Sequence, residues 1–349
     1  MLKNRYIFLD GIRGIAAILV LTRHTENYWQ FNFFRSHLAV DLFFILSGFV
    51  IGYAYDSKIR SGVISFQKFA LIRFIRLYPM FILSVVFSTL VFFAFIMKNG
   101  VSISKNIPEL LATITFTIFL IPSNFIGTHH LFPINGVYWS LFFELIANFI
   151  YVVIRPYLNN LVLICILLTF GTILTFSSYR NGSLDIGFAW GLNSFIVGFS
   201  RAIFGVFLGL FTYRFRAKLN SVNPTMPWLS VVLITLILTL PKLGNLDWLI
   251  DILAVTIIFP ITVLVCSKKN ESKFEKILLI LGSASYPLYV LHGPLASIIG
   301  FPVKSTVINY APFSGIFLVI ILVPLCLLIE KYYDIPLRNW LSKKTKIKI

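Results

Sequence analysis

Among the ionisable side chains inside the long apolar segments of this chain, five are the strongest candidates for proton transfer or anion binding. They are Arg13, His24, Asp41, Glu144 and His292. Charged groups within apolar segments cost free energy, so they are candidates for binding or catalysis. A histidine titrates near neutral pH, a carboxylate can orient it, and a guanidinium can bind an anion. The set predicts a site for acid–base chemistry with a cation nearby.

Four of these residues also have a plainer explanation. A single histidine near a helix end, such as His24, is usually an interfacial side chain. Asp41 precedes an apolar segment and suits a helix N-terminus. Glu144 could pair with Arg201, and His292 could be a polar group satisfied between helices. Because these groups occur together, we favour a role in catalysis over the plainer explanations.

The spacing of the residues predicts where they lie. Arg13 and His24 are eleven residues apart. This is close to three helical turns, so they project from nearly the same face, about 16 Å apart along the axis. Glu144 lies about six residues into a later apolar segment, and Asp41 begins another. We expect His24, Asp41 and Glu144 to converge at one depth near the outer side, with Arg13 nearer the cytoplasm.

The elements that hold these residues are predicted to be membrane-spanning helices. The 349-residue chain is 58% hydrophobic and only 12% charged, and a soluble domain carries about twice that charged fraction. Apolar runs approach the roughly 20 residues that a helix needs to cross a bilayer. They recur from end to end without a polar linker. We therefore expect one all-α integral membrane domain over residues 1–349, with no fused soluble domain.

Ten spans are predicted, with both termini in the cytoplasm. An eleventh candidate, 108–121, is short and bounded by Pro108 and Pro122. If it does not span, the basic clusters fall on one side, as the positive-inside rule requires. We therefore expect it to be a short re-entrant helix in a long outer segment, 98–137. The predicted spans are 7–27, 38–56, 78–97, 138–154, 161–177, 195–213, 228–240, 248–266, 278–300 and 313–331.

The net charge of +17 does not indicate nucleic-acid binding. Lysine and arginine lie in short loops and tails between apolar runs, which is typical of membrane topology. The three cysteines, Cys165, Cys266 and Cys326, stand singly in apolar segments. Their spacing fits neither a metal site nor a disulfide framework, so we expect no metal.

A basic amphipathic stretch, residues 65–79, precedes the third span. It could be a helix lying on anionic lipid. Alternatively, Arg73 and Arg76 could meet the phosphates of a soluble cofactor, because a guanidinium matches phosphate geometry.

Several motifs resemble, in order, those of the acyltransferase family 3 membrane proteins. Residues 8–24 (FLDGIRGIAAILVLTRH) are similar to the opening signature of that family, an arginine separated from a histidine by ten residues. The resemblance extends over roughly residues 6–340. The further matching segments are 39–49 (AVDLFFILSGF), 73–79 (RFIRLYP), 138–144 (YWSLFFE), 285–292 (SYPLYVLH) and 329–336.

The resemblance implies a transmembrane O-acyltransferase, most often an O-acetyltransferase. It would take acyl groups from cytoplasmic acyl-CoA, here acetyl-CoA, and pass them to a hydroxyl of a cell-envelope glycan or glycolipid. By the matching positions, His24 would be the catalytic histidine and Arg13 would help to place the donor. Glu144 would support the reaction centre, and Arg73 and Arg76 would be donor-side residues. The stand-alone chain is similar to the type that modifies exopolysaccharide or lipopolysaccharide in the bacterial inner membrane.

Four further residues stay as candidates: Asp41, Arg201, His292 and Glu330. Pro287 departs from the small polar residue that the family pattern has, so it could kink the ninth span near His292.

We expect direct transfer, with His24 as general base. A covalent relay through Ser47, Ser140 or a cysteine is the alternative. Other functions that suit the composition are a transporter or flippase for a glycan or lipid-linked precursor, and a membrane partner without activity. Oligomeric state is open.

Overall fold

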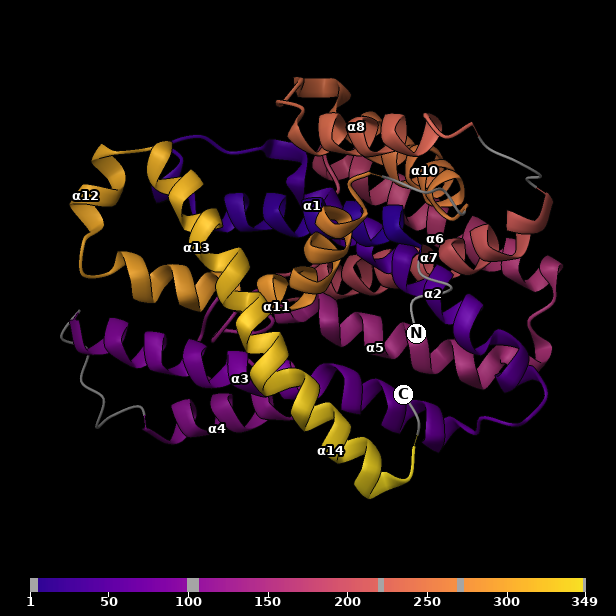
Figure 1. The fold of residues 1–349 in the computed structure, drawn as a ribbon, viewed down its shortest axis with the longest axis horizontal. Helices are drawn as coiled ribbons and strands as arrows, with labels where there is room; N and C mark the ends of the chain where they lie inside the picture. The colour runs from indigo at the N-terminus through magenta and orange to yellow at the C-terminus, as the bar shows by residue number, and fades with distance from the viewer. Residues whose placement is uncertain (1–5, 99–106, 219–222, 269–272, 348–349) are drawn as a thin grey trace.

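The computed structural model describes residues 6–98, 107–218, 223–268 and 273–347, and within them the chain is all-α (Figure 1). The only β-type pairing in these ranges is an isolated bridge between His130 and Ala189. Several residues that count in the positive-inside argument lie outside the described residues, among them Lys3 and Arg5 at the N-terminus and parts of the 98–137 segment and of the basic loop 268–276. The sidedness argued partly from them stays a prediction.

Fourteen α-helices follow one another in the described residues. In two places a π-helical turn, Ala254–Ile258 or Glu330–Asp334, joins two consecutive helices into one continuous rod. The helices are α1 (Ile7–His24), α2 (Ala39–Arg60), α3 (Phe66–Lys98), α4 (Ile107–Ile118), α5 (Tyr138–Ile154), α6 (Asn160–Asn181), α7 (Leu192–Phe215), α8 (Met226–Thr239), α9 (Asp247–Leu253), α10 (Phe259–Cys266), α11 (Glu275–Gly300), α12 (Lys304–Asn309), α13 (Phe313–Ile329) and α14 (Ile335–Thr345).

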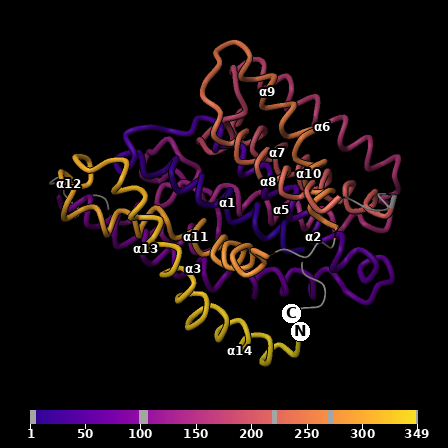
Figure 2. Tube along the Cα trace, turned by 45° about the horizontal axis from the view of Figure 1, so that its top comes forward, coloured from indigo at the N-terminus to yellow at the C-terminus, as the bar shows by residue number. Residues whose placement is uncertain are grey.

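All ten predicted spans fall on helices. Of the described helices, eight rods are long and apolar enough to cross a bilayer, namely α2, α3, α5, α6, α7, α9–α10, α11 and α13–α14. The remaining two spans are α8, which has 14 residues, and α1, which carries several charges. Helix α1 tolerates them because it lies inside the bundle, along α11 and beside α2 and α8 (Figure 2). The prediction of an all-α polytopic membrane protein is confirmed.

Helix α4 occupies the position of the eleventh candidate. Its 12 residues would extend about 18 Å, short of the roughly 30 Å hydrocarbon core. It packs against α3 (Figure 1), and the Tyr78 hydroxyl of α3 donates to the carbonyl of Ile118 at its end. This geometry fits a helix that enters the layer and does not cross it.

Glycines bring two helix pairs into close contact. A Cβ on Gly48 of α2 would lie 1.9 Å from the Val206 carbonyl oxygen of α7, and one on Gly209 of α7 would lie 2.0 Å from that of Ile45. On α1, a Cβ at Gly14 would lie 2.5 Å from the backbone of α11. Small residues let membrane helices approach this closely. The pairs α1–α11 and α2–α7 are therefore fixed in register.

Two segments are longer helices than the sequence suggested. Residues 65–79 are not a separate helix on the membrane surface, because α3 runs without a break from Phe66 to Lys98 through Pro79. The last span, 313–331, likewise continues through the π-turn into α14, so the basic tail is helical as far as Thr345. Arginines at the ends of both rods thereby become part of the helix bundle.

Candidate active site

Two cavities lie next to each other in the bundle. The first, of about 400 Å³, is lined by His24 and His292, and we name it the histidine cavity. The second, of about 420 Å³, is lined by Arg13, Arg73, Arg76 and Arg338, and we name it the arginine cavity.

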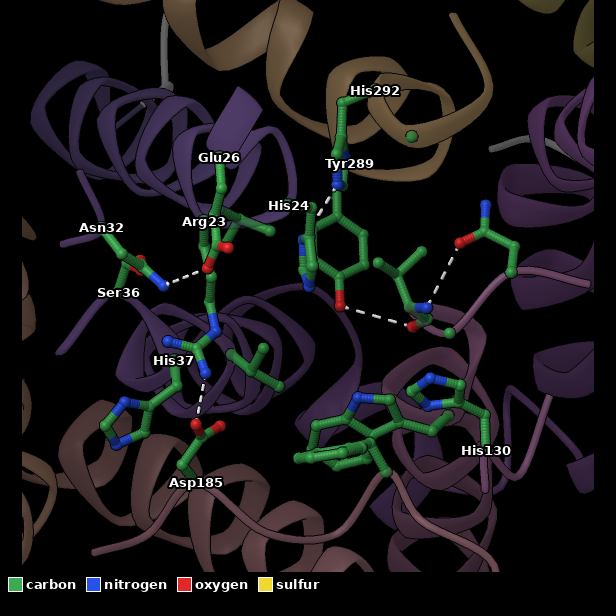
Figure 3. Close-up of a pocket in the computed structure, with 18 of the residues that line it drawn as sticks. Arg23, His24, Glu26, Asn32, Ser36, His37, His130, Asp185, Tyr289 and His292 are labelled. Atoms are coloured by element: carbon green, nitrogen blue, oxygen red, sulfur yellow. Dashed lines mark hydrogen bonds and ion pairs between the residues drawn. The ribbon is translucent and has the colours of Figure 1, made fainter. Parts of the chain in front are cut away.

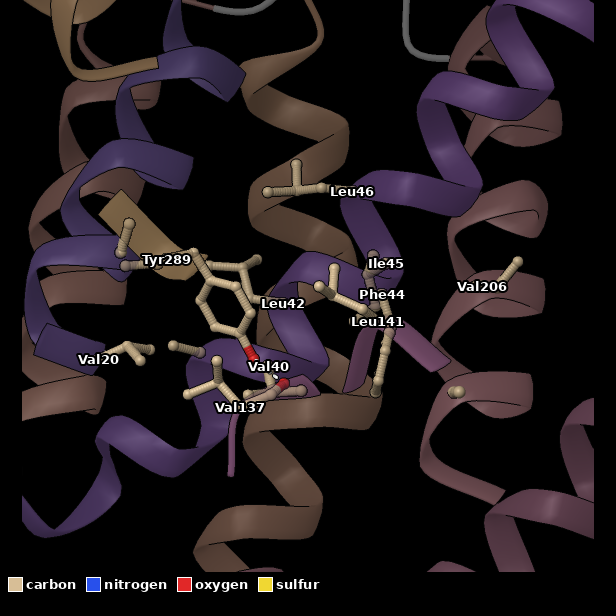
Figure 4. Packing of buried hydrophobic residues seen from close by; sticks show 14 of the residues in the cluster. Val20, Val40, Leu42, Phe44, Ile45, Leu46, Val137, Leu141, Val206 and Tyr289 are labelled. Carbon is tan, nitrogen blue, oxygen red and sulfur yellow. Dashed lines mark hydrogen bonds between the residues drawn. The ribbon is translucent and has the colours of Figure 1, made fainter. Parts of the chain in front are cut away.

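The two cavities share part of their lining. Tyr289 and Val40 line both cavities, and Figure 4 shows the Tyr289 ring among Val20, Val40 and Val137. The Tyr289 hydroxyl lies 2.6 Å from the hydroxyl of Ser140 and also donates to the Val137 carbonyl at 3.4 Å. A chain that passed from one cavity to the other would have to displace this tyrosine.

A pair of imidazoles stands at one wall of the histidine cavity (Figure 3). His24, the last residue of α1, has its Nδ1 3.0 Å from Nε2 of His292 on α11. The rings are stacked with centroids 5.1 Å apart. His292 is buried, whereas the His24 side chain is exposed to the cavity. The close packing of α1 on α11 sets this pairing.

Other polar groups around the histidine cavity are already paired. Arg23 forms an ion pair with Asp185, and Glu26 accepts a hydrogen bond from Asn32 at 2.7 Å (Figure 3). His130 also faces the cavity. Burial and the neighbouring charge of His129 lower the pKa of His130, so this ring is neutral near pH 7.

A buried ion pair lies at the floor of the same cavity. Arg201 of α7 donates to both carboxylate oxygens of Asp41 on α2, at 3.0 and 2.6 Å. It also donates to the Ile186 carbonyl and lies over the ring of Trp139. Asp41 and Arg201 are 0% and 1% exposed. An ion pair buried this deeply stabilises only with such complete hydrogen bonding.

Among the described residues, the arginine cavity contains one cation without an ion pair. Arg13 pairs with Asp10, Arg73 with Glu144 at 2.6 Å, and Arg338 with Asp334 at 2.7 Å. Arg76 has neither an ion pair nor a hydrogen bond to any residue in the described part of the chain. Its neighbours include Arg73, Arg13 and Arg338, which repel it. A guanidinium without a partner among other guanidiniums is suited to an anionic ligand.

The sequence was compared with those of known proteins. The family model described as an acyltransferase domain, that of acyltransferase family 3, matches residues 6–331. The chain belongs to this family. A protein of Rhizobium radiobacter described as "Protein 2 in picA locus" is 37% identical over 157 residues, which cover 42% of this chain and 81% of that protein. No solved structure matches the chain. The protein is therefore a membrane acyltransferase.

In the folded protein, residues that we expected to lie close together are apart. His24 faces the histidine cavity, Asp41 is buried beneath it, and Glu144 lines the arginine cavity. The plainer alternative, a pair between Glu144 and Arg201, is not formed, because Glu144 binds Arg73 and accepts a hydrogen bond from Ser47 at 2.6 Å. Helix α1 ends at His24, whereas Glu144 lies six residues into α5, roughly 9 Å along its axis.

The remaining candidates each have a defined place. Glu330 lines the arginine cavity, 3.9 Å from Arg338. Pro287 lies within α11, which continues through it to His292. None of the three cysteines lines either cavity. In the described ranges, no group of three or more His, Cys, Asp or Glu is arranged to hold a metal ion.

The sequence analysis missed a second buried charge cluster. Arg35 pairs with Asp247, and His37 lies 3.0 Å from Asp251. His37 lines the histidine cavity, and its other ring nitrogen lies 2.9 Å from the Phe34 carbonyl. Asp251 gave a usable signal, because it is a carboxylate inside a predicted span. Arg35 and His37 gave none, since they precede the second span in a segment that reads as a loop.

Proposed function

We propose that this acyltransferase moves an acyl group, most simply acetyl, from acyl-CoA to a hydroxyl of a glycan or glycolipid, with His24 as general base. The observation that carries the proposal is the pair of adjoining cavities. One presents a guanidinium, Arg76, that has no ion pair in the described part of the chain, and the other an imidazole, His24, with Tyr289 between them. A phosphate-bearing donor and a hydroxyl acceptor need these two environments.

The arginine cavity suits the donor. CoA carries phosphates, and guanidinium groups bind phosphate with bidentate, charge-assisted hydrogen bonds. The carboxylates of the cavity are all close to arginines, which leaves Arg76 as the cation free to receive a phosphate. Under the positive-inside rule this arginine-rich end faces the cytoplasm, where acyl-CoA is found.

The histidine cavity suits the acceptor. Its hydrogen-bonding side chains stand beside the rings of Trp139 and Phe188, and aromatic faces pack well against sugars that hydrogen-bond at their edges. Because Arg23 is paired with Asp185, the cavity favours a polyhydroxylated acceptor over an anionic one. It faces the outer side of the cytoplasmic membrane, where exopolysaccharide or lipopolysaccharide units are accessible.

The chemistry is a direct transfer. The acceptor hydroxyl gives its proton to Nε2 of His24 while its oxygen forms a bond to the thioester carbonyl carbon. The carbon–sulfur bond then breaks, and the departing thiolate receives the proton from the His24 imidazolium. The products are an ester and free CoA thiol. Ser47 and Ser140 line the arginine cavity and not the cavity of His24, which argues against an acyl relay from either serine to an acceptor activated by His24.

The test measures release of CoA thiol, and transfer of label, by the full chain in lipid nanodiscs with radiolabelled acetyl-CoA and crude envelope glycan. We expect label in the glycan with wild type and its loss with His24→Ala. His129→Ala is the matched control, because His129 lines neither cavity. A transporter would release no thiol under any condition, and an active His24→Ala variant would exclude this base.

A further inference from the structure

The hydrogen-bond partners of the two stacked imidazoles determine which nitrogen atoms carry protons. His292 Nδ1 lies 3.0 Å from the Leu288 carbonyl oxygen. A carbonyl only accepts, so His292 Nδ1 carries the hydrogen. A neutral imidazole has one N–H, which leaves the Nε2 of His292 with a lone pair.

His292 is neutral because no carboxylate among the described residues is hydrogen-bonded to it. It is 1% exposed, and its hydrogen-bond partners are the Leu288 carbonyl and His24. The other ring packed against it belongs to Tyr289. A cation buried without a carboxylate partner is strongly unfavourable, because it loses its hydration and gains no opposite charge.

The proton on His24 follows from the neutral His292. Nε2 of His292 can only accept, so the bond of 3.0 Å between the rings requires a hydrogen on Nδ1 of His24. The Nε2 of His24 then carries a lone pair. It belongs to the ring exposed to the histidine cavity.

Building on the proposed function, we propose that His292 is a positioning residue that fixes His24 in the tautomer with a basic Nε2. His24 is the last residue of α1, where a side chain without a partner would be free to rotate. His292 is held within α11 by its bond to the helix backbone. The orienting role that a carboxylate has in a Ser-His-Asp triad belongs here to a neutral imidazole.

The arrangement also serves the second half of the reaction. Once Nε2 of His24 has taken the hydroxyl proton, the imidazolium donates from Nδ1 to His292, and this bond strengthens because its donor is charged. Glu144, the carboxylate expected to do this, lines the other cavity and binds Arg73. One set of side chains thus binds the donor phosphates, and a separate set positions the base.

The test compares two substitutions of similar size. In His292→Gln, the amide oxygen can replace Nε2 as an acceptor, whereas the side chain of His292→Leu cannot accept. We expect His292→Leu to lower kcat by about 10²-fold, within the usual contribution of general-base catalysis. His292→Gln should stay within about fivefold of wild type, a limit set by the worth of one neutral hydrogen bond. Both should keep the wild-type KM for acetyl-CoA.

A double substitution separates positioning from a structural role. If His292 acts only through His24, His24→Ala/His292→Leu is no slower than His24→Ala. Equal losses in the Gln and Leu variants, or further loss in the double variant, would overturn the inference. Failure of the proposed function is distinguishable, because wild type would then release no thiol and the His292 variants would match it.

Discussion

Arg76 offers a direct test of where the donor binds, because it is the arginine of its cavity without an ion pair in the described structure. Replacing Arg76 by glutamine removes the charge and leaves no carboxylate exposed. A hydrogen bond to a charged group contributes about 1.5–3 kcal/mol. Arg76 is only partly buried, so we use the lower end of this energy range. It corresponds to roughly a tenfold increase in the KM for acetyl-CoA. We expect kcat to change little.

The assay distinguishes phosphate binding from general damage by changing the donor. Acetyl-pantetheine has the same thioester as acetyl-CoA and no phosphate. The tenfold effect of Arg76→Gln should therefore disappear with acetyl-pantetheine. Arg180→Gln, on the exposed end of α6, is the matched control. An equal rise in KM for both donors would refute the assignment, since the lost contact would not involve phosphate.

Arg73→Gln is a useful comparison because Arg73 is paired. Its removal leaves the Glu144 carboxylate without its cation in the donor cavity. We therefore expect a larger rise in KM than with Arg76→Gln, since the uncompensated charge would repel phosphate. If repulsion between Glu144 and the phosphates is the cause, the double variant Arg73→Gln/Glu144→Gln should have a lower KM for acetyl-CoA than Arg73→Gln alone. No recovery would mean that Arg73 itself holds the donor.

Three more predictions concern the buried framework. Arg201→Met leaves Asp41 buried and unpaired, and we expect a loss of about 3–5 kcal/mol of stability, measured as a lower detergent melting temperature. Gly48→Val places side-chain atoms in the backbone of α7, and we expect little folded protein on size-exclusion chromatography. Asp251→Asn removes the charge that pairs with His37. We expect a destabilised but folded protein with a raised KM for acceptor, because His37 lines that cavity.

The sequence was sufficient for the helices and for the identity of many important side chains, but not for their partners. Periodicity shows which face of a helix a residue occupies. The contact between two helices also depends on their axial offset, and a shift of one turn is about 5.4 Å. Glu144 on α5 pairs with Arg73 of α3, whereas Arg201 of α7 pairs with Asp41, and periodicity alone does not decide between these pairings. The pairing of His24 with His292 spans 268 residues, so no local pattern could reveal it.

The offset between the two cavities also constrains the proposed donor. Arg13 and His24 lie on one helix, α1, about three turns or 16 Å apart along its axis. A donor whose phosphates bind among the arginines therefore needs an extended arm to bring its thioester to His24. That arm must pass Tyr289, which is hydrogen-bonded in place. Acyl-CoA meets the requirement through its pantetheine chain, whereas acetyl phosphate carries its anion next to its acyl group and could not reach from one cavity to the other. The distance between anion site and base thus selects for a long donor, independently of how reactive the acyl group is.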